Sequence, residues 1–117
     1  MLSCQNYQTH TLEVEATAYN SLPGQTHALH PQITAWGDTL KPGMKSIAVS
    51  RDLIQLGLEH GTKVTIEGLP GKFIVRDKMN RRWEKKIDIY MGTDVAKARE
   101  WGIKTVTIRW KTSPEEE

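Results

Sequence analysis

The stretch VRDKMNRRWEKKIDIY, residues 75–90, joins the ends of two short apolar runs, and an aspartate interrupts each run. Asp77 closes the first run and Asp88 lies inside the second. Alternation in the second run places Ile87 and Ile89 on one face and Asp88 and Tyr90 on the other, which is typical of a strand with one buried face. The sequence therefore predicts two strands, joined by a basic loop, whose carboxylates converge.

Two neighbouring carboxylates acquire different pKa values, because ionising both together is unfavourable. One of them then stays protonated near neutral pH and can act as a general acid. The alternative is that each aspartate is simply solvated, or is paired with a cation of the intervening loop. The loop cations are Lys78, Arg81, Arg82, Lys85 and Lys86.

Outward from this stretch, the chain consists mainly of short alternating segments. They predict strands over residues 12–20, 33–36, 46–49, 62–68 and 104–110, with short helices over 51–56, after Ser50, and 94–101, after Thr93. Short strands in this number bury their faces best in a small closed barrel, which removes exposed sheet edges. We therefore expect a mainly β domain over residues 11–111, preceded by a flexible segment, 1–10, and followed by a polar tail, 112–117.

Composition narrows the class of protein. The 117 residues carry a net charge of +2, and no apolar run approaches the roughly 20 residues that cross a bilayer. That charge is too small for a typical nucleic-acid binder, and only the loop cations favour such a function. Histidines 10, 27, 30 and 60 lack the partners of a zinc site, so we expect no metal or other cofactor.

The N-terminal residues Met1-Leu2-Ser3-Cys4 leave two interpretations open. Their order is similar to the end of a bacterial lipoprotein signal, which would anchor the chain through Cys4. No charged segment or apolar core precedes them, so this chain shows no signal peptide, and Cys4 is equally consistent with an ordinary N-terminal cysteine. As the single cysteine, it excludes an intrachain disulfide.

The order of the motifs between residues 17 and 108 resembles the 3D domain family, named for three aspartates. The motifs are TAYN (17–20), ITAWGDTLKPG (33–43), SIAVSRDL (46–53), GTKVTIEGLPGKFIVRD (61–77), KKIDIYMG (85–92) and DVAKAREWGIKTVTI (94–108). The family includes the catalytic barrel of membrane-bound lytic transglycosylase A and stationary-phase survival proteins. The resemblance implies a six-stranded double-psi β-barrel with short peripheral helices.

The resemblance also implies an activity, that of a peptidoglycan lytic transglycosylase. Such an enzyme cleaves the MurNAc–GlcNAc bond without water, and the sugar's own hydroxyl forms a 1,6-anhydro ring. Asp88 matches the family's acid/base, and Asp77 matches its supporting aspartate. Where the family has AVDP this chain has AVSRD, so the third aspartate is either replaced by Ser50 or displaced to Asp52, and we expect Asp52. The residues expected to bind substrate are Tyr19, Thr34, Trp36, Gly37, Asn80, Arg82, Trp83 and Tyr90.

The same resemblance predicts the partners and location of the chain. We expect a monomer that acts on peptidoglycan glycan strands in the bacterial cell envelope, without nucleic acid or a transmembrane segment. DKMN (77–80) also replaces the DTGG that the family has after its first strand aspartate. This change and AVSRD leave an alternative open, a non-catalytic peptidoglycan- or polysaccharide-binding barrel of the expansin-like kind.

Overall fold

The computed structural model describes residues 7–21 and 32–113, which form six strands and two short helices. In chain order these are β1 (Gln8–Tyr19), β2 (Ser46–Val49), α1 (Arg51–Ile54), β3 (Lys63–Ile66), β4 (Phe73–Lys78), β5 (Lys86–Tyr90), α2 (Val95–Trp101) and β6 (Lys104–Thr112). Neither helix is long and apolar enough to cross a membrane. Cys4, His27 and His30, with the interpretations that depend on them, lie outside the described residues.

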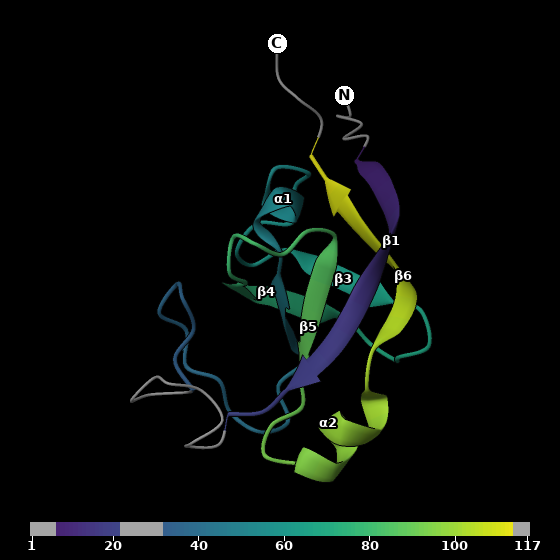
Figure 1. The fold of residues 1–117 in the computed structure, drawn as a ribbon. Coiled ribbons are helices and arrows are strands. Elements are labelled where there is room, and N and C mark those ends of the chain that lie inside the picture. The colour runs from purple at the N-terminus through teal and green to yellow at the C-terminus, as the bar shows by residue number, and fades with distance from the viewer. Residues whose placement is uncertain (1–6, 22–31, 114–117) are drawn as a thin grey trace.

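The strands close into a barrel in the order β1-β5-β2-β4-β3-β6, which confirms the prediction of a closed, six-stranded, mainly β fold. Two neighbouring pairs, β1 with β5 and β2 with β4, are parallel, and the other pairs are antiparallel. Figure 1 shows β1 and β5 side by side at the front and α2 below one end of the barrel.

Alternation along the strands fills the barrel. Every second residue of β3, β5 and β6 points inward, because successive side chains of a strand point to opposite faces. These inward residues form one apolar cluster with side chains of β1, β2, β4 and α1. Among its most deeply buried members are Val14, Ile47, Val49, Leu53, Val64, Ile66, Val75, Ile87, Ile89 and Ile108.

The predicted strand over residues 33–36 is wrong. Only Ile33 forms an isolated bridge, with Thr39, and a tight turn lies between them. The Thr34 hydroxyl accepts a hydrogen bond from the Asp38 amide, and Gly37 has a φ of +90°, which a strand does not permit. Local hydrogen bonding by Thr34 therefore prevails over the weak β propensity of this segment.

Element ends also differ from the predictions. β1 begins at Gln8 and β6 ends at Thr112, and these two residues are paired, so the barrel extends past both predicted boundaries, residues 11 and 111. The cap of α2 is Asp94 rather than Thr93, because the Asp94 carboxylate accepts the Lys97 amide. Pairing between distant strands sets the ends of β1 and β6, and the geometry of the cap sets the start of α2.

Candidate functional site

Four residues form one row across four adjacent strands. Thr17 of β1 is opposite Asp88 of β5, Asp88 is opposite Ala48 of β2, and Ala48 is opposite Asp77 of β4. Because neighbouring strands lie about 4.8 Å apart, the two aspartates are separated at the backbone by two strand spacings, roughly 10 Å. We call Thr17, Asp88, Ala48 and Asp77 the acid row.

A bulge in β4 brings Asp77 into the acid row. Val75 is opposite Ile47, but the next residue of β2, Ala48, is opposite Asp77, so Arg76 is the extra residue. Regular alternation would point Asp77 inward with Val75, whose side chain is fully buried. A bulge re-aims the side chains that follow it, and this one turns Asp77 to the outer face that Asp88 occupies.

Asp88 has the electrostatics of a carboxylic acid that titrates near neutrality. Its Oδ1 accepts a hydrogen bond of 2.9 Å from the Thr17 hydroxyl. Burial is the largest cause that raises the pKa of Asp88 to about 6, and the charge of Asp77 raises it further. The Thr17 bond and the charge of Lys86 oppose the shift. The predicted like-charge effect of Asp77 is therefore present, but desolvation outweighs it.

Asp77 holds a neighbouring loop in place. Its Oδ1 accepts the backbone amide of Ala35 at 2.8 Å and that of Lys78 at 2.9 Å. Burial and the charge of Asp38 raise the pKa of Asp77, whereas these two hydrogen bonds and the charge of Lys78 lower it. Asp77 therefore fixes residues 33–39, a loop that contains three predicted binding residues, Thr34, Trp36 and Gly37.

Two tyrosines lie two residues along the strands from the acid row. Tyr19 and Tyr90 are paired in register, and their ring centroids are 5.5 Å apart. The Tyr90 hydroxyl and the Ser21 hydroxyl are 2.7 Å apart, and only 3% of Tyr90 is exposed. Burial and the charges of Asp77 and Asp88 raise the pKa of Tyr19. Tyr19 thus stays a neutral phenol close to both acids, and Tyr90 packs against it.

A second group of predicted residues lies on the loop between β4 and β5. Lys86 is two residues before Asp88 on the same face, and its ammonium group lies 4.0 Å from the centroid of the Trp83 ring. The Arg82 guanidinium stacks on the same ring at 4.7 Å, and the Asn80 side chain accepts the Arg82 amide. Trp83 is therefore held between two cations, one of which, Lys86, lies two residues from Asp88 along β5.

The structure does not join Asp52 to the acid row. Asp52 lies in α1, and its Oδ2 accepts the Lys85 amide at 3.0 Å, so it fixes the end of the β4–β5 loop. The charges that shift the pKa of Asp77 and Asp88 do not include that of Asp52. Among the described residues, Asp52 therefore positions the β4–β5 loop and does not act as a third acid beside Asp77 and Asp88.

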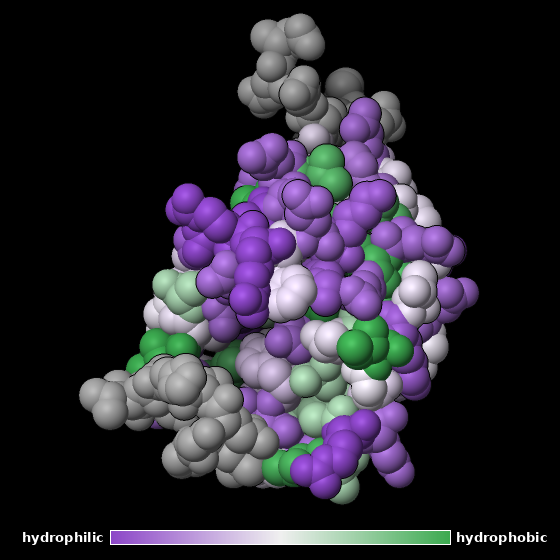
Figure 2. Space-filling view, viewed as in Figure 1, coloured by the Kyte–Doolittle hydropathy of each residue, from purple (hydrophilic) through white to green (hydrophobic). Residues whose placement is uncertain are grey.

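Three contributors to the site were not among the predicted site residues: Thr17, Ala48 and Lys86. Thr17 shares the polar face of β1 with Tyr19, which is the signal that would have found it. Ala48 could not be found from its own segment, because three apolar residues follow one another from Ile47 to Val49 and the register of the strand is set by two partner strands. Figure 2 shows that the face over β1 and β5 is mainly hydrophilic, with scattered apolar residues.

Residues 7–21 and 32–113 contain no group of three or more histidine, cysteine or acidic side chains arranged to hold a metal ion. Three hollows in the surface of the described residues are lined by neither Asp77 nor Asp88, and one of the three reaches Tyr90 from the end of the barrel next to α2. The acid row offers hydrogen-bonding carboxyl and hydroxyl groups, and the neighbouring Tyr19 adds a phenol.

Comparison with known proteins gives structural matches alone. No family model and no curated protein matches the chain. It is similar to the apo expansin of Clavibacter michiganensis, with a TM-score of 0.56 and 17% identity, over 92% of this chain and 52% of that one. An aspartate-to-asparagine mutant of the same expansin, in complex with cellohexaose, matches with a TM-score of 0.52 and 18% identity over the same shares.

The chain therefore spans about half the length of the expansin structures that it matches. At this level of identity the likeness shows the fold. The chain is a six-stranded double-psi β-barrel with short peripheral helices, as the sequence analysis expected. The matched structures are expansins, and neither is a protein of the 3D domain family.

Proposed function

We propose that the chain is a polysaccharide-binding barrel that holds a cell-wall glycan against the acid row. One observation carries this proposal: the barrel that presents Asp88 and Asp77 on one outer face is similar, over 92% of the chain, to an expansin that was solved with cellohexaose. The chemistry fits, because carboxyl oxygens accept from sugar hydroxyls while hydroxyl and phenol groups both donate and accept.

The aromatic side chains beside the row support binding of a sugar. Trp83 lies by Lys86, and Trp36 lies by Lys78 and His60 at the β4 side, with 5.2 Å between the ring centroids of Trp36 and His60. Both tryptophans are half-buried, so each keeps part of its ring surface for contact. Rigid aromatic rings with a few polar groups around them are the usual elements of ligand sites.

The state of Asp77 argues against two-carboxylate hydrolysis. Hydrolysis by a carboxylate pair needs a second acid that is free to activate water or to attack the sugar. The Asp77 Oδ1 is instead occupied by two backbone amides, and it orders the loop over residues 33–39. Asp88 is then the acid of the pair whose carboxyl group has no backbone partner among the described residues, and a pair in which one acid orders a loop suits binding better than two-carboxylate hydrolysis.

A second candidate function is the lytic transglycosylase activity that the resemblance to the 3D domain implies. One observation favours it: the pKa of Asp88 is raised to about 6, which suits an acid that must give and then regain a proton near neutral pH. This reaction needs no second catalytic acid, because its nucleophile is a hydroxyl of the substrate itself, already tethered next to the reacting carbon. Peptidoglycan and the bacterial cell envelope are the partner and location that this candidate proposes.

Cosedimentation with sacculi and with cellulose, followed by mass spectrometry of released fragments, tests both functions. The proposed binding predicts pelleting with at least one of the two polymers, and a loss of affinity of about tenfold in Trp36→Ala or Trp83→Ala, as expected when a stacking contact is removed. Anhydro-muropeptides from the native chain, and none from Asp88→Asn, would establish the transglycosylase. Absence of both pelleting and fragments would refute both functions.

A further inference from the structure

The barrel carries a second polar surface, on the side opposite the acid row. A hollow with a volume of about 530 Å³ lies over β3 and β6. Four basic side chains line it, Lys63, Lys72, Arg109 and Lys111, and we call these four residues the basic hollow. β3 and β6 are the two strands that carry no residue of the acid row, and in the barrel order β3 is three strands from β5, which carries Asp88.

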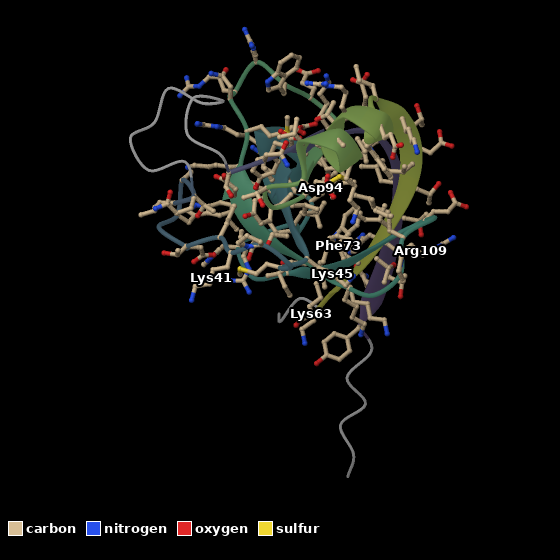
Figure 3. All side chains as sticks on the ribbon, turned by 90° about the horizontal axis from the view of Figure 1, so that it is seen from below. Lys41, Lys45, Lys63, Phe73, Asp94 and Arg109 are labelled. Atoms are coloured by element: carbon tan, nitrogen blue, oxygen red, sulfur yellow. The ribbon has the colours of Figure 1, made fainter. Side chains whose placement is uncertain are left out.

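Strand alternation explains why the cations gather there. Val64, Ile66, Ile108 and Trp110 point into the barrel, so the residues between them point outward. Register then places Arg109 between Thr65 and Thr11, and Lys111 beside Thr9. Figure 3 shows Lys63 and Arg109 pointing away from the barrel interior.

The charge of the basic hollow is not neutralised within the described residues. No aspartate or glutamate lines it, and all four basic residues are exposed. Two other cations of the barrel are paired: Lys86 with Glu15 at 2.9 Å, and Arg76 with Asp38 at 3.5 Å. Within residues 7–21 and 32–113, none of the four forms an ion pair. Like charges held together in a concave surface produce a local positive potential that attracts anions, although the net charge of the chain is only +2.

We propose that the basic hollow binds an acidic polysaccharide whose repeating charges are carboxylates. The Arg109 guanidinium is planar and matches a carboxylate with two parallel hydrogen bonds. The lysines supply point charges for the next acidic groups, and the hydroxyl of Thr65, next to Arg109, is available to sugar hydroxyls. A linear polyuronate presents this combination of planar anions and hydroxyl groups.

The same surface is poorly suited to nucleic acid. Proteins that bind single strands stack bases on exposed aromatic rings, and the aromatic residue that lines this hollow, Trp110, is only 4% exposed. The indole NH of Trp110 is already bonded to the Leu56 carbonyl at 3.1 Å. The hollow therefore offers charge and hydroxyl groups without a stacking platform.

This inference is independent of the function proposed for the acid row, because no residue is shared between the two surfaces. A barrel with both would hold an acidic glycan on one side and present the acid row to another strand of wall polymer on the other side. Failure of one surface leaves the binding of the other intact, and the two proposals are thus separable by experiment.

Affinity electrophoresis and calorimetry of the full chain with polygalacturonate test the proposal. The variant Lys63→Gln/Arg109→Gln removes two of the four charges while keeping a polar, hydrogen-bonding side chain at each position. The matched control Lys41→Gln/Arg99→Gln makes the same change of charge at exposed positions away from the hollow. At low salt we expect about a tenfold loss of affinity in the first variant, as for two lost ionic contacts, and less than a twofold change in the control.

Several results would overturn the proposal. These are no binding of polygalacturonate at low salt, equal losses in the two variants, or unchanged binding to a methyl-esterified polymer that carries no charge. Loss of binding in Arg81→Gln/Arg82→Gln, with Lys63→Gln/Arg109→Gln unaffected, would move the site to the β4–β5 loop. Tighter binding of a single-stranded oligonucleotide at the same four residues would replace the glycan by nucleic acid.

Discussion

Asp77 and Asp88 lie on opposite sides of Ala48, and both point to the outer face of the barrel because β4 contains one extra residue, Arg76, at this level. Without that bulge, Arg76 would be opposite Ala48 and Asp77 would point into the apolar core. β4 and β5 both pair with β2, and the register of these two pairings places the two acids at the same level of the barrel. The loop that connects β4 and β5 does not determine this arrangement.

The Asp88 carboxyl should make stability depend on pH. Its folded pKa of about 6 lies above the value of 3.8 for the free side chain, so the folded state binds this proton more tightly than the unfolded state. The contribution of this group to stability is complete below pH 3.8 and is lost as pH rises through about 6. In Asp88→Asn, thermal melting should therefore show a flatter pH profile between pH 4 and 7, and a gain on the order of 2 kcal/mol at pH 7. An unchanged profile would contradict this account.

Thr17→Val should raise the pKa of Asp88 above about 6, because it removes the hydroxyl that stabilises the charged carboxylate. The side-chain carboxyl signal of Asp88 in a carbon-13 NMR titration measures this directly. Thr17→Ser keeps the hydroxyl and should titrate close to the native chain. A midpoint in Thr17→Val at or below the native one would show that the hydrogen bond does not set the pKa.

Asp77→Ala should loosen the loop over residues 33–39. The change leaves the amides of Ala35 and Lys78 without their acceptor, at a cost of about 1–3 kcal/mol in the free energy of unfolding. Hydrogen exchange at the Ala35 amide should accelerate more than exchange in β6. The matched variant Asp77→Asn keeps an oxygen acceptor and should retain most of the protection. Equal exchange rates in Asp77→Ala and the native chain would mean that the loop is held by other contacts.

Gly57→Ala should destabilise the barrel through a collision with β6. Gly57 has a φ of +102°, and a Cβ atom built there would lie 2.5 Å from the Thr112 Cγ2 methyl. The control is Gly68→Ala, at a φ of +90° with nothing within 4 Å of the added atom, so it carries the backbone strain without the collision. Chemical denaturation should show a loss for Gly57→Ala that exceeds the loss for Gly68→Ala by about 1 kcal/mol or more. Equal losses would leave backbone strain as the whole effect.

Much of the barrel follows from residues read one strand at a time. Alternation in KIDIY places Ile87 and Ile89 inside and Asp88 outside, and the same reasoning identifies Val64, Ile66 and Ile108 as core residues. Predictions from single segments were wrong where the hydrogen bond of one polar side chain determines the local structure. At residues 33–36 the Thr34 side chain closes a turn, and at the start of α2 Asp94 is the cap in place of Thr93.

The sequence by itself determined the mainly β class, the inward and outward faces of most strands, and the outward position of Asp88. The reason is that side-chain alternation is a local property of an extended chain. Only the tertiary structure decided that Asp77 is outward, that Ala48 separates it from Asp88, and that Asp52 fixes Lys85 instead of joining them. Those relationships depend on the register between strands distant in sequence and on a one-residue bulge, and neither is a property of any single segment.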